Sequence, residues 1–276
     1  MQIGGKVFDI GHRTYIMGIL NVTPDSFSDG GRFQNMDAAL RHAQEMIRNG
    51  ADILDVGGES TRPGHVLVSE EEEIRRVVPV IRGLKEQLDI PVSIDTYKSK
   101  VARAALDAGA DLVNDIWGLK YDRELAGVIA EYGVPCCLTH NREKAEYKDF
   151  IPEVLNDLRE SLRLAEAAGI SREQIILDPG IGFGKTYEMN LETLHYMERF
   201  HTFGYPMLLG TSRKSVIGLT LNLPADQREE GTLVTTVMAV MKKYAFVRVH
   251  DIKANKRAIQ MAEAILQTGT EESFSR

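Results

Sequence analysis

The chain has few cysteines, no long apolar run and no excess of basic residues, and each shortage excludes a class of protein. Its two cysteines are the neighbours Cys136 and Cys137, in an apolar run where alternate side chains point to opposite faces. They are poorly placed to bridge each other, so we expect reduced thiols and no disulfide framework. No apolar run approaches the length of a membrane span, and no secretory leader opens the chain. We therefore expect a cytoplasmic protein without a membrane partner.

The charge balance is acidic, with 33 Lys and Arg against 40 Asp and Glu and a net charge of -7. This argues against nucleic acid as the partner, because phosphate backbones favour a basic face. A small anionic substrate stays compatible, since a local cluster of cations can bind one inside an acidic protein. The length of 276 residues is near that of one (β/α)₈ barrel, so we expect residues 1–276 to form one domain.

Eight short apolar runs each end at residues that do chemistry. A run of Val, Ile and Leu without alternation is typical of a strand buried on both faces of a parallel sheet. Helical patterns separate the runs, so we expect an α/β protein, a (β/α)₈ TIM barrel, with a short N-terminal hairpin from Gln2 to Arg13 around Gly11-His12. A doubly wound open sheet ranks lower, because chemistry at all eight strand ends suits a closed barrel better than one crevice. The runs are Tyr15–Leu20, Ile53–Val56, Val92–Ile94, Leu112–Val113, Pro135–Leu138, Ile175–Leu177, Met207–Leu209 and Phe246–Val249.

Helix boundaries are marked by capping residues. Asp37 is expected to cap a helix that runs to Asn49, and Ser69 with Glu72 forms a capping-box pattern. The acidic run Glu70–Glu73 is typical of a solvated first turn rather than of a ligand cluster.

Two loops after strands are rich in polar residues and glycine. Asn21–Gly31 carries Asp, Asn and Ser oxygens that could meet a hard cation or close over a substrate, or form a solvated loop. Asp178–Thr186 resembles a P-loop only superficially, because Pro179 stands where the first Walker glycine belongs. This segment is either a strand-end carboxylate with a glycine loop that serves a site, or a turn with a capping Asp.

Cations follow three strands, in Thr61-Arg62, Ser212–Ser215 and Arg248–His250. In a barrel these ends converge, and converging Arg, Lys and His side chains suggest a phosphate site. Three other strand ends supply acceptors and an amide donor, namely Asp95, Asn114 and Asp178. Buried carboxylates without donors are costly, so we expect a ligand rich in N–H groups. The residues alone predict a barrel that binds a flat polar heterocycle beside a phosphate.

Seven segments, in order along nearly the whole chain, together resemble dihydropteroate synthase. That family joins 6-hydroxymethyl-7,8-dihydropterin diphosphate to 4-aminobenzoate in folate biosynthesis, releases pyrophosphate, and is the sulfonamide target. The resemblance therefore implies a transferase with two small-molecule substrates, and a homodimer. The segments are Asn21–Gly31, Gly58–Gly64, Ser93–Thr96, Val113–Asp115, Asp178–Phe183, Ser212–Ser215 and Arg248–Asp251.

The resemblance also implies a role for each site residue. The pterin would be held by Asp95, Asn114, Asp178 and Lys214. The diphosphate would be bound by Asn21, Thr61, Arg62, Arg248 and His250. The 4-aminobenzoate pocket would be formed by Phe27, Thr61, Pro63, Phe183 and Ser215. The implied cofactor is Mg²⁺, which would be faced by Asn21 and Asp29.

The family's chemistry implies an SN1-like reaction governed by charge. The C–O bond to the diphosphate breaks early and leaves a methylene cation delocalised into the dihydropterin ring. Carboxylates would stabilise that cation, and cations with Mg²⁺ would stabilise the departing anion. The catalytic residues are therefore expected to be Asp95, Asp178, Lys214, Arg248 and His250.

One position departs from the family pattern. The family often has Met-His after the fifth strand, whereas this chain has Thr139-His140. If Thr139 lines the pterin pocket, a thioether contact with the ring is lost.

Three other functions share part of this pattern. A pterin-binding methyltransferase acting with a corrinoid partner would share the barrel. Its reaction does not need the cations of Ser212–Ser215 and Arg248–His250. A Schiff-base aldolase would place its lysine in an apolar cage, whereas Lys214 follows Arg213 in a loop. A folate-binding protein without turnover would not need the diphosphate cations. The synthase is the interpretation that uses every motif.

Overall fold

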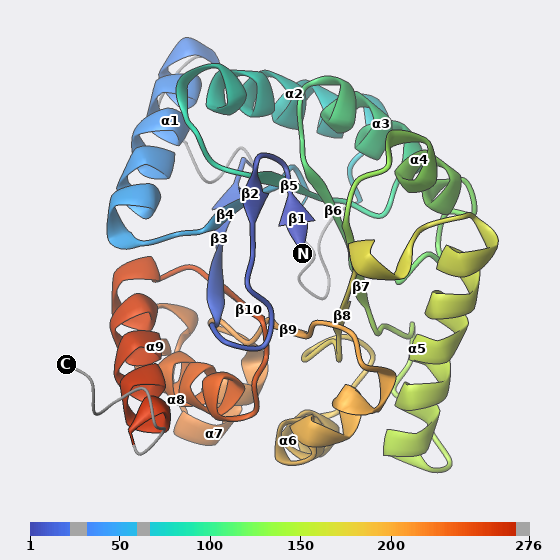
Figure 1. Ribbon diagram of the computed structural model, residues 1–276, viewed down its shortest axis with the longest axis vertical. Helices are drawn as coiled ribbons and strands as arrows, with labels where there is room; N and C mark the ends of the chain where they lie inside the picture. Colours follow the sequence, from blue (N-terminus) through green and yellow to red (C-terminus); the bar gives the residue numbers. More distant parts are fainter. Residues whose placement is uncertain (23–31, 60–66, 269–276) are drawn as a thin grey trace.

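A computed structural model describes residues 1–22, 32–59 and 67–268 of the chain, and within them confirms the predicted TIM barrel. Eight parallel strands neighbour one another in the order β8-β7-β6-β5-β4-β3-β10-β9, and a parallel bridge between Leu177 and Met207 joins the two ends. Figure 1 shows the helices surrounding these strands. The strands are β3 (Tyr15–Asn21), β4 (Ile53–Gly57), β5 (Val92–Asp95), β6 (Leu112–Asp115), β7 (Cys136–Thr139), β8 (Ile175–Asp178), β9 (Leu208–Leu209) and β10 (Phe246–Val249).

The strands bury both faces because alternate side chains point to the barrel interior and to the helices. The interior cluster includes Ile53, Leu112, Cys137, Ile176, Leu208 and Phe246. The larger cluster between strands and helices includes Leu54, Val56, Val113, Leu138 and Leu177. One position in every two along a strand therefore faces the interior, and the last such positions approach the carboxyl end of the barrel.

The helices follow the strands in alternation and largely match the sequence patterns. Ser69 accepts a hydrogen bond from Glu72 N at 3.2 Å and caps α2 as predicted. The prediction for Asp37 was wrong, because α1 begins at Arg32 and Asp37 lies in its second turn. The helices are α1 (Arg32–Asn49), α2 (Glu70–Gln87), α3 (Ser99–Asp107), α4 (Leu125–Tyr132), α5 (Phe150–Ala167), α6 (Tyr187–His195), α7 (Ser215–Leu221), α8 (Glu229–Met241) and α9 (Ile252–Gln267).

A short antiparallel hairpin opens the chain, as predicted, but its turn lies elsewhere. Strand β1 (Gln2–Ile3) pairs with β2 (Lys6–Val7) across a turn at Gly4-Gly5. Gly4 has φ +55°, a conformation that favours glycine. The expected turn at Gly11-His12 is a second, smaller one that ends in a bridge between Ile10 and Arg13. Ile3 and Phe8 are buried in the interior cluster, so this segment closes the amino end of the barrel.

The glycine after β8 is predicted to resist substitution. Gly180 has φ +73°, and a Cβ there would overlap the backbone oxygen of His140. We expect Gly180→Ala to lower the free energy of unfolding by about 2–4 kcal/mol through strain and displaced backbone. Gly127 in α4 is the matched control, because a Cβ there meets nothing within 4 Å. Gly127→Ala should raise stability by about 0.5–1 kcal/mol. Urea unfolding measures both changes, and equal losses in the two variants would contradict the prediction.

Candidate active site

Polar side chains from several strands meet at the carboxyl end of the barrel interior. Asp95 of β5 pairs in register with Asn114 of β6, and Thr139 of β7 pairs with Asp178 of β8. Each of these strands thus ends in a polar residue where its apolar interior positions stop. All four side chains are buried. The predicted pterin-binding residues of these strands therefore lie at the same end of the barrel.

Arg248 of β10 ties two of the carboxylates together across the barrel. Its Nε donates to Asp55 Oδ2 and its Nη2 to Asp95 Oδ2, both at 2.6 Å. Asn114 Nδ2 donates to the same Asp55 oxygen at 3.0 Å. Burial alone would lower the pKa of Arg248, but Asp55 and Asp95 raise it above its ordinary value. The guanidinium is therefore a fixed positive charge with little freedom to move.

The contacts of Asp95 leave one of its carboxylate oxygens unused. Within the described residues, its Oδ1 is buried without a hydrogen-bond partner, as are Asp55 Oδ1 and Ser93 Oγ. Burial raises the pKa of Asp95 to about 7, against the opposing effect of Arg248. An unsatisfied buried acceptor costs free energy, so a ligand N–H aimed at it would be strongly favoured.

Asp178 and Lys214 form the opposite side of the site. Asp178 Oδ1 accepts from Gly180 N at 2.7 Å, and burial raises the pKa of the carboxyl while Lys214 lowers it. Lys214 donates to the carbonyl of Ile181, and its Nζ lies 4.0 Å from the centre of the Phe183 ring. Burial lowers the pKa of Lys214 to about 8, although Asp178 acts in the other direction. The ammonium is thus partly desolvated, and the charge of Asp178 favours its protonated form.

The segments that follow β9 and β10 bring the predicted site residue His250 close to a hydroxyl. Ser212 Oγ lies 2.9 Å from His250 Nδ1 and accepts from His250 N at 3.2 Å. Arg213, with φ 58°, turns away and pairs with Asp251 at 2.7 Å. The left-handed backbone conformation of Arg213 turns its side chain away from those of Ser212 and Lys214. Ser212 and Lys214 thereby face the site, while Arg213 pairs with Asp251 outside it.

Asn21 closes the list of described site residues at the end of β3. A Cβ at Gly57 would lie 3.4 Å from Asn21 Oδ1 and 3.7 Å from Asp95 Oδ2, so these two oxygens approach the same glycine.

Ser215 is exposed at the first turn of α7. Five predicted residues lie outside the described part of the chain, namely Phe27, Asp29, Thr61, Arg62 and Pro63.

Asp55 is a site residue that the sequence analysis missed. It was absorbed into the apolar run Ile53–Val56, yet it is buried and contacts both Arg248 and Asn114. Its signal was parity, because Asp55 lies two residues after the interior Ile53 and so faces the same way.

Two further searches concern only the described residues. Residues 1–22, 32–59 and 67–268 contain no group of three or more His, Cys, Asp or Glu that could hold a metal ion. No helix in these ranges is long and apolar enough to cross a bilayer.

Comparison with known proteins places this barrel in a family. The sequence profile described as pterin binding enzyme matches residues 17–250. Dihydropteroate synthase of Clostridium beijerinckii is 62% identical over 268 residues, which span 97% of this chain and 100% of that protein.

Solved structures agree with the sequence relatives. Clostridium difficile dihydropteroate synthase, solved in the presence of pteroic acid, superposes with a TM-score of 0.92 at 52% identity, covering 94% of this chain and 99% of that one. The Xanthomonas albilineans enzyme with 4-aminobenzoic acid gives a TM-score of 0.88 at 41% identity, covering 93% and 94%. The chain belongs to the dihydropteroate synthase family of pterin-binding enzymes.

Proposed function

We propose that this chain condenses 6-hydroxymethyl-7,8-dihydropterin diphosphate with 4-aminobenzoate, forming 7,8-dihydropteroate and pyrophosphate. It is a transferase of folate biosynthesis and, with its relatives, a sulfonamide target. The observation that carries the proposal is the set of buried Asp95, Asn114 and Asp178 with the half-buried Lys214, beside Arg248 and His250. Hydrogen-bond acceptors for a heterocycle and cations for a diphosphate thus meet at one barrel end.

The pterin is proposed to lie between the two carboxylates. The unpartnered Oδ1 of Asp95 supports its role as an acceptor for N–H groups of the heterocycle. Asp178 would take further N–H groups, while Lys214 would donate to the ring carbonyl and a ring nitrogen. A neutral heterocycle with amino and ring N–H donors would thereby replace the water that these carboxylates lose on burial.

The diphosphate is proposed to lie beside the cations. Arg248 and His250, together with Asn21, Thr61 and Arg62, would bind it. A magnesium site fits the donors present, because Asn21 supplies a hard oxygen and Mg²⁺ is commonly held by few protein ligands plus substrate phosphates. Asp29 is the proposed second ligand. When bound, Mg²⁺ would add positive charge beside the leaving diphosphate.

The proposed chemistry follows from where the charges lie. As the C–O bond breaks, the electron pair leaves with the diphosphate and a cation remains on the methylene carbon. Asp95 and Asp178 would stabilise that cation through the ring, while Arg248 and His250 would stabilise the anion. The amine of 4-aminobenzoate then forms the new C–N bond and loses a proton. Phe27, Thr61, Pro63, Phe183 and Ser215 are the residues proposed to orient that amine.

Assembly as a homodimer of two such barrel domains, each spanning residues 1–276, is part of the proposal. Large apolar side chains are exposed on the neighbouring helices α7, α8 and α9, which Figure 1 shows side by side. A second copy would cover this surface, which consists of Leu219, Leu221, Val234, Met241, Met261, Ile265 and Leu266. The cytoplasm is the proposed location, in keeping with two free buried cysteines.

The test is pyrophosphate release from the dihydropterin diphosphate with Mg²⁺, with and without 4-aminobenzoate. Release that depends on 4-aminobenzoate supports the synthase. Pterin binding without release would contradict it and would favour methyl transfer to a corrinoid partner instead.

Lys214 predicts a pH dependence. It is proposed to hold the pterin as an ammonium, and its pKa is about 8. We expect kcat/KM for the pterin substrate to fall as pH rises through about 8, because deprotonation removes the positive charge and weakens the donor. In Lys214→Met, kcat/KM should be low at every pH and should lack this limb. A limb that persists in Lys214→Met would assign it to another group.

A further inference from the structure

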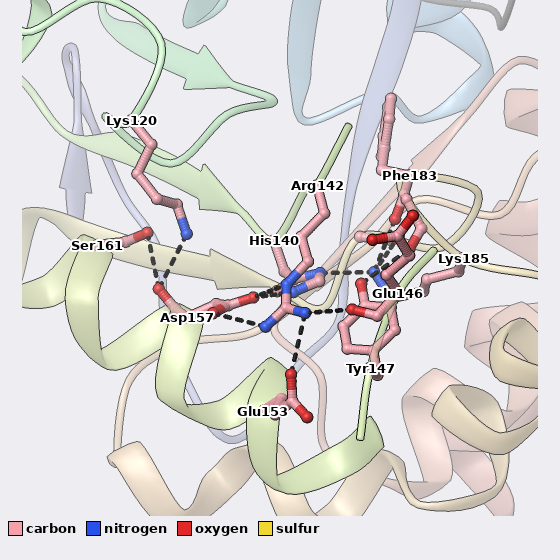
Figure 2. Close-up of polar contacts among 12 residues, drawn as sticks. Lys120, His140, Arg142, Glu146, Tyr147, Glu153, Asp157, Ser161, Phe183 and Lys185 are labelled. Atoms are coloured by element: carbon pink, nitrogen blue, oxygen red, sulfur yellow. Dashed lines mark hydrogen bonds and ion pairs between the residues drawn. The ribbon is translucent and has the colours of Figure 1, made fainter. Parts of the chain in front are cut away.

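A polar relay around the buried His140 lies behind the glycine loop that follows β8. Figure 2 shows its members converging from the segment after β7, from α5 and from the loop. Asp157 lies 3.0 Å from His140 Nε2, and His140 Nδ1 lies 2.7 Å from Lys185 Nζ. Arg142 donates two hydrogen bonds to Asp157, from Nε to Oδ2 at 2.6 Å and from Nη2 to Oδ1 at 3.1 Å. None of these residues belongs to the proposed substrate contacts.

The proton positions in this relay follow from the partners. Burial would raise the pKa of Asp157, but His140 and Arg142 hold it below its ordinary value, so Asp157 is a carboxylate. A carboxylate needs a donor, so His140 Nε2 carries the ring proton. Burial lowers the pKa of His140 to about 3, with Lys185 acting in the same direction, so Nδ1 is left as an acceptor. His140 therefore donates to Asp157 through Nε2 and accepts from Lys185 through Nδ1, and so links the two residues.

The Lys185 ammonium has three donors and three acceptors. Besides His140 Nδ1, it donates to the carbonyls of Gly180 at 2.9 Å and Phe183 at 3.1 Å. Burial lowers the pKa of Lys185, and the three acceptors favour the protonated form that can satisfy them all. Both carbonyls belong to the loop 180–184, so Lys185 fixes this loop at two points.

The opposite side of the same loop contacts Lys214. The Ile181 carbonyl accepts from Lys214, and the Phe183 ring lies 4.0 Å from Lys214 Nζ. A Cβ at Gly182 would lie 3.1 Å from Lys214 Cδ. The loop thus lies between two half-buried lysines, with Lys214 facing the proposed pterin site and Lys185 facing the relay. A shift of the loop by a few tenths of an ångström would move the surface against which Lys214 is held.

We propose that Lys185 is a positioning residue, which acts through the loop 180–184 to orient Lys214 and Phe183 in the substrate site. The relay through His140 to Asp157 ties that orientation to α5. Lys185 does not touch substrate, and its effect is transmitted by the backbone carbonyls that it holds. The inference rests on the proposed function, because its main readout is condensation.

The first test compares Lys185→Met with Lys85→Met. Lys85 is likewise a partly buried lysine, but it forms an ion pair with Asp111 at 2.7 Å, just before β6 at the amino end of the barrel. Kinetics are measured well below the melting temperature of each variant. We expect kcat/KM for 4-aminobenzoate to fall at least tenfold in Lys185→Met and to stay within twofold in Lys85→Met. The alkaline limb of the pterin kcat/KM should also shift in Lys185→Met, because the loop surface against which Lys214 is held moves and changes the burial of its ammonium.

A purely structural role for Lys185 predicts a different pattern. Both lysine variants would then lose stability while keeping the wild-type kcat/KM and alkaline limb, and that result overturns the inference. Equal kinetic losses in the two variants overturn it as well. A wild-type protein that performs no condensation instead contradicts the proposed function, so the two failures are distinguishable.

A second pair of variants decides the matter if Lys185→Met does not fold. Glutamine at His140 offers an amide N–H for Asp157 and a carbonyl for Lys185, whereas leucine offers neither. We expect His140→Gln to keep kcat/KM within about threefold of wild type and His140→Leu to lose at least tenfold. Equal kcat/KM in these two variants would show that the relay does not position the site.

Discussion

Arg248→Met is expected to lower the free energy of unfolding by about 3–5 kcal/mol at neutral pH, because it leaves two buried carboxylates without their cation. Arg248 donates to Asp55 and Asp95 at 2.6 Å, and both side chains are buried. Condensation should fall by about 10³-fold or more, since the variant also lacks a cation for the leaving diphosphate. Urea unfolding and kcat/KM measure the two effects.

The stability deficit of Arg248→Met should grow with pH. The pKa of folded Asp95, about 7, lies above that of the unfolded chain, and removing Arg248 raises it further. The folded variant then binds a proton that the unfolded chain releases, so its stability keeps falling above pH 7, where the wild type levels off. Asp55→Asn in the Arg248→Met background removes one uncompensated charge and should recover part of the loss. A deficit that is independent of pH and of Asp55 would contradict this account.

Asp178→Asn is expected to separate function from stability. The amide oxygen can still accept from Gly180 N, now at 2.7 Å from Asp178 Oδ1, so the loop keeps this contact. The buried charge is removed, and burial had already raised the pKa of Asp178, so we expect stability within about 1 kcal/mol of wild type. Activity should nevertheless fall by about 10²–10³-fold, because the charge that stabilises the cationic ring is lost.

The control for Asp178→Asn is Asp111→Asn. Asp111 lies just before β6 and pairs with Lys85, away from the proposed site. This variant should keep full activity and lose some stability, the reverse of Asp178→Asn. Wild-type kcat/KM in Asp178→Asn would remove Asp178 from the proposed catalytic residues.

The barrel and much of its site could be predicted because position in a parallel strand constrains both burial and direction. Asp95, Asn114 and Asp178 each end an apolar run, and carboxyl ends of parallel strands meet at one face. The structure brings these three together with Lys214 and Arg248, although they are far apart in sequence. The grouping therefore followed from the fold class alone, before any distance was known.

Some features of the fold and the candidate site could not be predicted from the local sequence pattern. Asp55 stands inside a run, where only strand parity indicates that it faces the interior with Arg248. The sequence pattern around Lys185 indicates only a glycine loop, because nothing local shows that its ammonium turns back to His140. Likewise, the hairpin turn at Gly4-Gly5 was overlooked in favour of Gly11-His12. For Asp55 and Lys185 the partner lies in another element, so spacing along the chain carries little signal. For the hairpin, by contrast, the Gly4-Gly5 pair is itself a local turn signal.

Thr139, where this chain departs from the family pattern, lies beside Asp178 and Gly180. Thr139 is buried, pairs in register with Asp178, and its Cγ2 would lie 3.2 Å from a Cβ at Gly180. A threonine here leaves more room than the methionine common in the family, beside the start of the loop that Lys185 holds.

The most direct test of the account counts products in a single reaction of wild-type protein, dihydropterin diphosphate, 4-aminobenzoate and Mg²⁺. Mass spectrometry measures 7,8-dihydropteroate while a coupled assay measures pyrophosphate. The account predicts one dihydropteroate for each pyrophosphate released, and loss of both in Lys214→Met. Pyrophosphate without dihydropteroate would show hydrolysis instead of condensation, and would contradict the claim that this site joins the two substrates.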